Sequence, residues 1–309
     1  MPSYNHAAYV EQCLRSIMAQ TLAPAELIVI DDGSRDGSPQ VIERVLKEAP
    51  FPCELVARGN RGLCATLNEG LARSRGEYFT YLGSDDAWLP DALRERVGLL
   101  EDRPNAVLAY GHFYVMDGQS RVVGSTLDWG VGFTDGDARR MLLVPLIPQS
   151  STVLYRRAAV ARYGWNEQAR LEDYELFLRM SADGEFSLGP RVLSAWRHHG
   201  RNTSGNTSMM MEEFIAAQLQ VADVLGIRED ELAASQAAIR FNCAAEFLDG
   251  GDRWRAARLT LGNLQGAPSA SAALLRLVRL VTPLRVLHWR DERLRRKNRE
   301  RYHSVALQR

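Results

Sequence analysis

The sequence predicts an α/β fold with a mostly parallel sheet, followed by an α-helical carboxyl-terminal region. Short apolar runs alternate with amphipathic stretches over the first two thirds of the 309 residues, which is the pattern of buried strands and the helices that cover them. Two of these runs end in a turn that carries a pair of aspartates. Beyond residue 208 the strand-like runs stop and the pattern becomes helical.

The individual elements follow in chain order. Because the apolar runs are short and bounded by turn residues, we expect strands at residues 26–30, 53–57, 77–82, 106–110, 150–155 and 191–196. Amphipathic spacing predicts helices around residues 10–18, from Ser38 onward, and at 63–71 and 89–100. The stretch 111–149 is rich in Gly and Asp, so we expect loops there with one short helix around 135–144. Another helix is expected at about 172–182.

A polar stretch at residues 198–208 separates this α/β part from the rest of the chain. After it we expect helices, arranged as antiparallel pairs, at residues 209–225, 229–248, 252–264 and 270–301. A prior of about 150 residues per domain favours two domains. We therefore expect one domain over residues 1–205 and a helical region with a basic tail over residues 206–309.

The composition excludes several classes of protein. Hydrophobic residues make up 46% and charged residues 25%, which argues against a disordered chain, collagen and a disulfide-framework peptide. No uninterrupted apolar run approaches the roughly 18 residues needed to span a bilayer. Because a polar stretch follows Met1 directly, no secretory leader is visible, and we expect a cytoplasmic location.

The net charge of zero hides a basic carboxyl-terminal end. Residues 276–309 contain 11 Lys and Arg against 3 Asp and Glu. Arginine interleaved with Leu, Val and Trp289 suits a helix on an anionic membrane surface, which would make the protein peripheral on the inner face of the membrane. The alternative is a helix that packs its apolar face on the protein and turns its arginines outward. No recognised DNA- or RNA-binding module accompanies the charge, so we expect no nucleic-acid partner.

The first residues resemble the carboxyl end of a parallel strand and the loop after it, where ligands bind in such sheets. The strand itself is missing before Met1. A start codon assigned too late, or a truncated chain, would explain this. A sheet that lacks a central strand would leave backbone groups unpaired, which is costly.

Two acidic pairs are candidates for ligand binding. Asp31-Asp32 follows the predicted strand 26–30, and Asp85-Asp86 follows the strand 77–82. Such carboxylates can accept hydrogen bonds from a nucleoside or hold Mg²⁺ or Mn²⁺. Solvated turns are the simpler interpretation of both. The spacing from Asp32 to Glu43 also matches a calcium loop, but a strand precedes it where a helix is required.

Two further sites are ambiguous from the residues alone. Glu172 and Asp173 begin a predicted helix, where acids are stabilised by the helix dipole, and the same dipole would keep Asp173 ionised as a general base. His198 and His199 follow a predicted strand and could bind a metal or phosphate, or they could be surface residues of a linker.

The order of these motifs resembles glycosyltransferase family 2 over about residues 1–205. The motifs are Pro2-Ser-Tyr4-Asn5, Asp31-Asp32-Gly-Ser34, Asn60-x-Gly62, Asn68, Ser84-Asp85-Asp86, Arg156-Arg157, Glu172-Asp173 and His199-Gly200. This family contains inverting enzymes with the GT-A fold, here with an apparently truncated first strand.

The resemblance implies a role for each matching residue. Pro2 and Tyr4 match the loop around the nucleobase of the donor, and Asp32 matches the acid that hydrogen-bonds the base. Of Asp85 and Asp86, one would point toward the ribose and one would hold the divalent metal, Mn²⁺ or Mg²⁺. His199 would lie near the metal and the diphosphate. Asp173 matches the general base.

The implied function is metal-dependent transfer of one sugar, with inversion, from a nucleoside-diphosphate sugar to a hydroxyl of a glycan or lipid-linked saccharide of the cell envelope. A UDP-sugar is favoured. Gly83 stands where many relatives carry another Asp, which leaves open which acid binds the metal. The Gln-x-x-Arg-Trp motif of processive synthases is missing, so we expect single transfer. The alternative is a catalytically silent relative that binds nucleotide sugars or acts as a scaffold.

Overall fold

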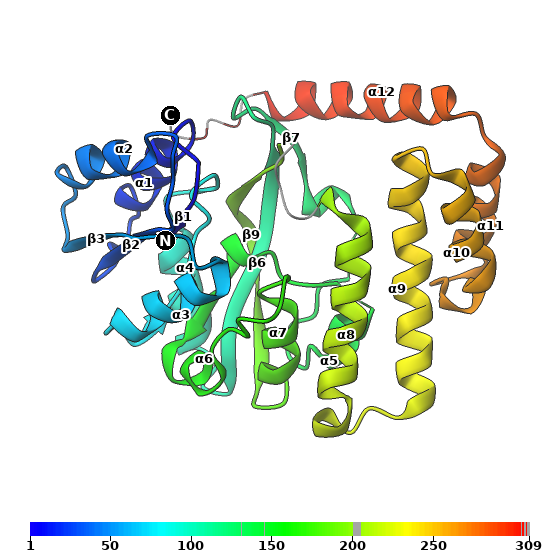
Figure 1. The fold of residues 1–309 in the computed structure, drawn as a ribbon, viewed down its shortest axis with the longest axis horizontal. Helices are drawn as coiled ribbons and strands as arrows, with labels where there is room; N and C mark the ends of the chain where they lie inside the picture. The colour runs from blue at the N-terminus through cyan, green and yellow to red at the C-terminus, as the bar shows by residue number, and fades with distance from the viewer. Residues whose placement is uncertain (131, 145, 200–204, 304, 306, 308–309) are drawn as a thin grey trace.

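A computed structural model describes residues 1–130, 132–144, 146–199, 205–303, 305 and 307. Figure 1 shows strands and short helices in one part of the molecule and long helices in the other. The strands are β1 (Pro2–Ser3), β2 (Leu27–Asp31), β3 (Cys53–Ala57), β4 (Tyr78–Phe79), β5 (Ala87–Trp88), β6 (Ala106–Met116), β7 (Val122–Ser125), β8 (Leu154–Arg156) and β9 (Glu185–Arg197).

The strands form two sheets. The first has the order β1-β2-β3 and is parallel, with Pro2 opposite Ile30 and Leu27 opposite Cys53. The second has the order β4-β8-β6-β9-β5, with β7 paired to β6. In it β6 and β9 are parallel, but the other pairs are antiparallel. The expectation of a mostly parallel sheet is therefore wrong for this half. The β6–β7 hairpin illustrates the reason, because a connection of a few residues permits antiparallel pairing alone.

The helices alternate with strands early in the chain and then follow one another. They are α1 (Val10–Met18), α2 (Ser38–Leu46), α3 (Leu63–Arg73), α4 (Ala92–Glu101), α5 (Arg139–Leu143), α6 (Arg157–Tyr163), α7 (Tyr174–Met180), α8 (Thr207–Leu225), α9 (Glu229–Asp249), α10 (Arg253–Gly262), α11 (Ala270–Val281) and α12 (Leu284–Tyr302). The sequence predicted most of these, and with the sheets they confirm an α/β fold with a helical extension.

Two predictions about elements are wrong. The predicted helix 270–301 is two helices, because Pro283 has no amide hydrogen and lies between α11 and α12. Residues 111–116 were expected to form a loop, but they extend β6, since β7 and β9 pair with them on both edges. The local apolar pattern reveals neither a break within a helical stretch nor the pairing of one strand with another.

Helices cover both faces of the first sheet. Leu14 of α1 and Val45 of α2 pack with Val29 on one face. On the other face, Gly70 of α3 lies against Ile30, where a Cβ on Gly70 would be 3.7 Å from the Ile30 Cδ1 atom. Because both faces are covered, β2 is a continuous apolar run, as expected for a parallel strand.

The helical extension shares the core of the second sheet. The ring of Phe214 on α8 meets Tyr174 of α7 edge-on, with ring centroids 4.8 Å apart. The Gln218 Nε2 atom donates to the Tyr174 hydroxyl at 2.8 Å and to the Ser235 hydroxyl on α9. These contacts bury α8 against α7. The division into residues 1–205 and 206–309 stays a prediction.

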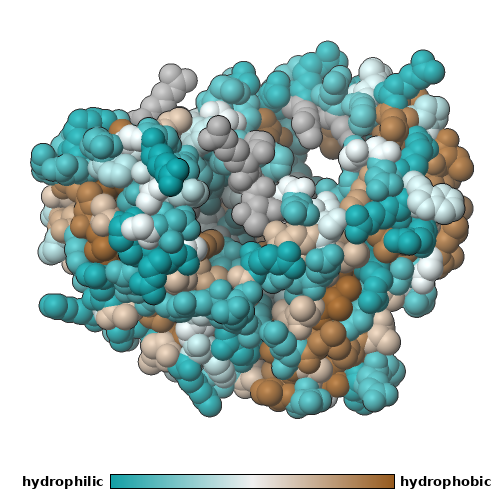
Figure 2. Space-filling model, viewed as in Figure 1, coloured by the Kyte–Doolittle hydropathy of each residue, from teal (hydrophilic) through white to brown (hydrophobic). Residues whose placement is uncertain are grey.

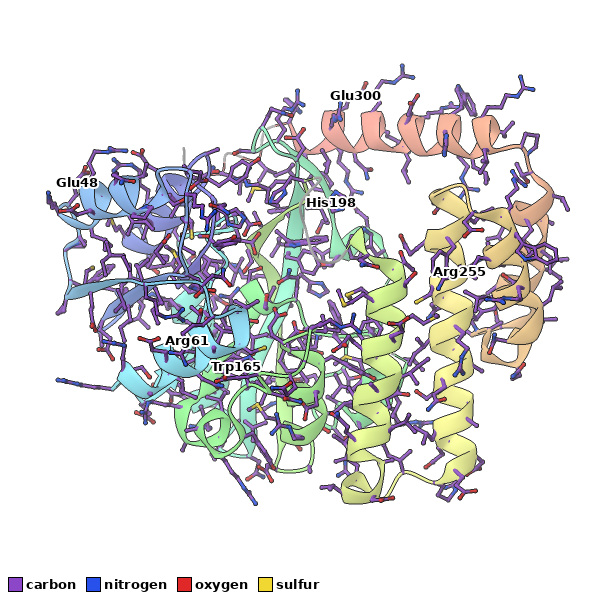
Figure 3. All side chains as sticks on the ribbon, viewed as in Figure 1. Glu48, Arg61, Trp165, His198, Arg255 and Glu300 are labelled. Carbon is purple, nitrogen blue, oxygen red and sulfur yellow. The ribbon has the colours of Figure 1, made fainter. Side chains whose placement is uncertain are left out.

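The outermost helices leave much apolar surface exposed. In α11 no residue is buried, and Trp254 on α10 is 81% exposed. Figure 2 shows hydrophobic surface at the edge formed by α10 and α11. Toward the interior, Arg255 of α10 stacks on Phe247 of α9 with its Cζ atom 4.1 Å from the ring centroid (Figure 3). Within the described residues, no helix is both long and apolar enough to cross a membrane.

Candidate active site

Loops that follow β1, β2, β4 and β9 meet at one place. The backbone amide of Asn5, after β1, donates to the Ser34 hydroxyl at 2.8 Å, and Asn5 has a positive φ of 55°. The His6 Nδ1 atom lies 2.8 Å from the Ser84 hydroxyl, in the loop after β4. These contacts bring the predicted acidic motifs together at the carboxyl ends of the strands.

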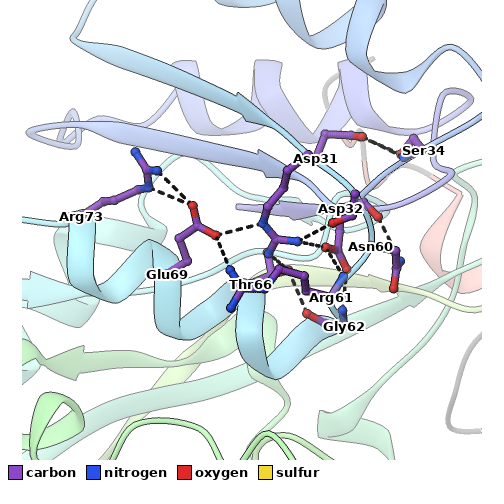
Figure 4. Close-up of polar contacts among 11 residues, drawn as sticks. Asp31, Asp32, Ser34, Asn60, Arg61, Gly62, Thr66, Glu69 and Arg73 are labelled. Carbon is purple, nitrogen blue, oxygen red and sulfur yellow. Dashed lines mark hydrogen bonds and ion pairs between the residues drawn. The ribbon is translucent and has the colours of Figure 1, made fainter.

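Asp32 lies at the centre of the polar network drawn in Figure 4. Its Oδ1 atom accepts from the Arg61 amide at 2.8 Å and pairs with the Arg58 guanidinium. Its Oδ2 atom accepts from the Gly62 amide at 2.8 Å. A carboxylate oxygen has two acceptor positions. Among the described residues the Oδ2 atom uses one of them, so Asp32 retains capacity for one further donor.

The Arg58 guanidinium that holds Asp32 is itself fixed by α3. Its Nε atom donates to the Glu69 carboxylate at 2.9 Å, and its Nη2 atom donates to the Thr66 hydroxyl at 2.9 Å. Glu69 also pairs with Arg73 one turn further on (Figure 4). Asp32 is 4% exposed, so its orientation is set by buried contacts and not by solvent.

Asp85 forms a cluster with two histidines. The His199 Nε2 atom lies 3.0 Å from the Asp85 Oδ2 atom, and the His6 Nδ1 atom lies 3.8 Å from the Oδ1 atom. One ligand atom from each residue lies within 4.8 Å of the others. A carboxylate and two imidazoles suit a divalent transition-metal ion, whereas Mg²⁺ prefers oxygen ligands. The donor set therefore fits a metal of this kind.

Asp86 is next in the chain but is not a member of this cluster. Its Oδ1 atom accepts from the backbone amide of Arg197 at 2.8 Å, and the side chain is 5% exposed. Burial and the neighbouring Asp85 carboxylate raise the pKa of Asp86 well above its ordinary value. Asp86 is outside the group whose ligand atoms converge, and its role as a metal ligand stays a prediction.

Arg197 joins the acidic loop to the end of β9. Its guanidinium is fully buried, and its Nε atom donates to the backbone carbonyl of Asp85 at 2.6 Å. The Nη2 atom donates to Gln12 at 2.6 Å and the Nη1 atom to the carbonyl of Asp117 at 3.1 Å. The Tyr9 ring lies under the guanidinium at 4.5 Å, and it also stacks on His199 at 5.4 Å. Arg197 thus ties α1, β6 and the acidic loop together.

Asp173 begins α7 and is buried. Its Oδ1 atom has no hydrogen-bond partner among the described residues. Burial and the Glu172 carboxylate raise the pKa of Asp173 well above its ordinary value. This direction is opposite to the expectation that the helix dipole keeps Asp173 ionised. The dipole of this seven-residue helix would lower the pKa of Asp173, but desolvation and the negative charge of Glu172 raise it by more.

Tyr81 connects this carboxylate pair to the acidic loop. Its hydroxyl donates to the Glu172 Oε1 atom at 3.2 Å, and Tyr81 precedes Asp85 by four residues. Its ring meets Trp165 edge-on, with centroids 5.8 Å apart. Trp165 Nε1 and the Tyr155 hydroxyl are likewise buried without a partner in the described part of the chain. Unsatisfied buried polar atoms are costly and mark places where a polar ligand can bind.

The remaining predicted residues lie in or next to β1 and directly after β9. Pro2 is in β1 and half-buried, and Tyr4 is 48% exposed in the loop after it. His198 is exposed next to His199, and Gly200 lies outside the described residues. The sequence missed His6, Arg197, Tyr81 and Trp165 as part of the site. Only His6 carried a usable signal, since it directly follows the predicted ligand loop.

Comparison with known proteins gives one family match. The sequence pattern described as Glycosyl transferase family 2 matches residues 1–164. An uncharacterized glycosyltransferase from Nostoc sp. is 28% identical over 163 residues, which are 52% of this chain and 50% of the relative. A chondroitin synthase from Pasteurella multocida is 28% identical over 209 residues, or 66% of this chain and 21% of the synthase. The chain therefore spans about half or less of the length of these relatives.

Solved structures resemble the fold. A mannosyltransferase from Pyrobaculum calidifontis, in complex with GDP-Man and Mn²⁺, has a TM-score of 0.58 and 19% identity, covering 95% of this chain and 83% of that one. S. aureus TarS in complex with UDP has a TM-score of 0.52 and 15% identity, covering 85% and 87%. At this identity the likeness concerns the fold.

The buried contacts of Arg197 predict a large loss of stability in Arg197→Met. Removal of the guanidinium breaks its hydrogen bonds to Gln12, Asp85 and Asp117 and leaves the Asp85 carbonyl without its donor, so we expect a loss of about 3 kcal/mol or more, measured by urea denaturation. Arg191→Met on the same strand is the control. Arg191 is a 53%-exposed partner of Glu95, and its loss should cost less than about 1 kcal/mol. Equal losses in the two variants would contradict the assigned role.

Proposed function

Because the chain belongs to glycosyltransferase family 2, we propose that it transfers one sugar from a nucleoside-diphosphate sugar to a hydroxyl of a glycan or lipid-linked saccharide. The transfer inverts the anomeric centre, and a UDP-sugar is the favoured donor. One observation carries the proposal. The cluster of Asp85, His6 and His199, which could hold a metal ion, lies among the loops joined to the one that carries Asp32, the residue that we assign to the nucleoside.

Donor binding is assigned to the loops after β1 and β2. The Asp32 Oδ2 atom has room for one more donor, and the N–H of a uracil ring would supply it. Tyr4 presents a half-exposed ring next to this loop, and Pro2 lies in the strand before it. Thymine offers the same N–H group and guanine a similar one, so dTDP- and GDP-sugars are the alternatives to the UDP-sugar that we favour.

The metal is assigned to Asp85 and His199, with His6 as a third ligand and Asp86 nearby. This mixture of nitrogen and oxygen donors suits a divalent transition metal, and we favour Mn²⁺ because the mannosyltransferase of similar fold is described with Mn²⁺ and GDP-Man. A bound divalent ion would neutralise the charge that develops on the diphosphate leaving group. The protein's own contribution is to hold Asp85 in place, through Arg197 on its carbonyl and His199 on its carboxylate.

Asp173 is proposed as the general base. Its Oδ1 atom is buried and unpartnered among the described residues, so it can accept the proton of an acceptor hydroxyl. As that O–H bond breaks, the acceptor oxygen forms the new bond to the anomeric carbon and the bond to the diphosphate breaks. One displacement inverts the centre, and the proton remains on Asp173. A raised pKa makes the carboxylate a stronger base.

We also propose that the carboxyl-terminal helices contact an anionic membrane from the inner face. Leu274, Leu275, Val278 and Val281 on α11 are each more than half exposed. Residues 253–303 contain thirteen Arg and Lys against three Asp and Glu. An exposed apolar helix face in a basic part of the chain is typical of an interfacial helix, and such a location suits a lipid-linked acceptor.

Nucleotide binding tests the proposal first. The melting temperature is measured with UDP, dTDP, GDP and CMP, each with and without Mn²⁺. A ligand at about 100 times its Kd adds about 2.7 kcal/mol of stability. We expect one diphosphate, UDP by preference, to raise the melting temperature in the presence of Mn²⁺.

Asp85→Asn should abolish the metal-dependent part of this shift, whereas Asp137→Asn, at an exposed aspartate, should retain it. A folded protein that shows no shift with any nucleotide would contradict the proposal. That result would favour a catalytically silent relative.

Asp173→Asn tests the base. The amide cannot accept the proton, so we expect transfer to fall by about 100-fold or more while the nucleotide-dependent thermal shift persists. Stability gives a second readout. The raised pKa means that the unfolded chain releases this proton at lower pH than the folded one, so the carboxylate lowers stability as the pH rises above its ordinary pKa.

The neutral amide removes this penalty, and the melting temperature at pH 8 should rise. Asp183→Asn, at a partly exposed ion pair with Arg162, is the control and should change neither property appreciably. Full transfer activity in Asp173→Asn would contradict the assignment.

Vesicle sedimentation tests the membrane contact. The protein should bind vesicles that contain phosphatidylglycerol and not vesicles of phosphatidylcholine alone. Leu275→Glu combined with Val278→Glu should reduce binding by about 10-fold or more, because charge is placed on the face that enters the interface. Val224→Glu, at a 78%-exposed position of α8, is the matched control. Binding that is independent of anionic lipid would exclude this proposal.

A further inference from the structure

The two adjacent carboxyl groups of Glu172 and Asp173 have different surroundings. The Tyr81 hydroxyl donates to the Glu172 Oε1 atom at 3.2 Å. The Asp173 Oδ1 atom, in contrast, is buried and has no hydrogen-bond partner among the described residues. Two carboxyl groups that interact closely take up and release protons as a pair. Because only one of them is bonded by a phenol, a proton held by this pair is not divided equally.

Buried contacts hold Tyr81 in place. Its side chain lies in the core, 3% exposed, with its ring edge-on to Trp165 at 5.8 Å between centroids. Trp165, labelled in Figure 3, also meets the Tyr155 ring of β8 edge-on at 6.0 Å. The Thr80 hydroxyl donates to the Val153 carbonyl at 2.7 Å and fixes the backbone directly before Tyr81. Packing and this hydrogen bond therefore set the position of the Tyr81 hydroxyl.

Burial acts on every titratable group around the pair. It raises the pKa of Glu172, and the hydrogen bond from Tyr81 opposes that rise. Burial and the negative charge of Glu172 together raise the pKa of Asp173. Burial also raises the pKa of Tyr155 well above its ordinary value and that of Cys64 on α3 to about 12. Tyr155 and Cys64 are therefore neutral at pH 7 and supply no charge to the pair.

The charged side chains that neighbour the pair in the chain are engaged elsewhere. The contacts are those of Arg170 with Glu213, of Arg179 with Glu175, and of Glu167 with the Asn68 amide. In the described part of the chain, no basic side chain offsets the rise in the pKa of Asp173. The hydrogen bond from Tyr81 is thus the side-chain contact that favours one anion of the pair over the other.

We propose that Tyr81 is a positioning residue that keeps Glu172 as the anion of the pair and so directs the single proton of the pair to Asp173. This inference rests on the proposed function, in which Asp173 is the general base. When the O–H bond of the acceptor breaks, the proton bonds to Asp173, and the remaining negative charge stays on Glu172 beside the Tyr81 hydroxyl. Without that hydroxyl the proton would settle on Glu172. Asp173 would then be a weaker base, because it would no longer lie beside a negative charge.

The pH dependence of stability tests this proposal without any substrate. Tyr81→Phe keeps the ring and removes the hydroxyl, which stabilises the ionised form of Glu172 more than its neutral form. The melting temperature of Tyr81→Phe should therefore fall further below the parent value at pH 8 than at pH 5, by about 3 °C or more. Tyr110→Phe is the matched control. Tyr110 is also buried, but its hydroxyl donates to the Thr134 carbonyl at 2.7 Å, so its loss should be the same at both pH values.

The pH profile of sugar transfer gives a second readout. The rate should rise as the pH passes the raised pKa of Asp173. In Tyr81→Phe and in Glu172→Gln this rise should move to lower pH by about half a unit or more, and the rate above it should fall. Addition of Tyr81→Phe to Glu172→Gln should cause no further shift, because the hydroxyl acts through Glu172.

Two results would overturn the proposal. An equal pH dependence of the melting temperature in Tyr81→Phe and Tyr110→Phe would show that the hydroxyl does not stabilise an ionised Glu172. A further shift of the rate profile on adding Tyr81→Phe to Glu172→Gln would show that Tyr81 acts on Asp173 directly. A pH-dependent loss of stability in a protein that transfers no sugar would support the position of the proton and contradict the proposed function, so the two failures are distinguishable.

Discussion

The buried guanidinium of Arg197 holds the acidic loop in the position on which the candidate site depends. It bonds the carbonyl of Asp85, while its own amide bonds the carboxylate of Asp86. Its other donors reach Gln12 on α1 and Asp117 after β6. A buried cation is costly to desolvate, and this one is compensated because its Nε, Nη1 and Nη2 atoms each donate to an acceptor. The hydrogen bond from this guanidinium fixes the backbone of Asp85, and the Asp85 carboxylate lies beside His6 and His199.

The same region contains carboxyl groups whose ionised form is disfavoured by burial. Burial and the Asp85 charge raise the pKa of Asp86, and burial and the Glu172 charge raise the pKa of Asp173. Like charges in a dry environment are stabilised by a cation or by a proton. The surroundings of the two carboxylate pairs differ. Asp85 has two imidazoles beside it, a group that could hold a metal ion, whereas the Asp173 Oδ1 atom has no hydrogen-bond partner among the described residues.

The two ends of the chain contact different sheets. β1 has two residues, yet it directs the loop that carries Tyr4 and His6 onto Ser34 and Ser84. At the other end, α12 returns to β7, where Arg301 and the Tyr302 hydroxyl contact Asp128 (Figure 1). The intervening helices α10 and α11 extend away from the sheets and leave an apolar face exposed.

The sequence by itself determined the α/β alternation, the position of the acidic pairs and the helical extension, because apolar periodicity and turn residues are local properties. It also indicated Asp32, Asp85, Asp173 and His199 as site residues. The tertiary structure decided which groups meet. His6 joins Asp85 because β1 pairs beside β2, and Arg197 enters the acidic loop because β5 and β9 pair. Antiparallel pairing in the second sheet and the burial that raises the pKa of Asp173 cannot be read from the local sequence, since both depend on packing between segments far apart in the chain.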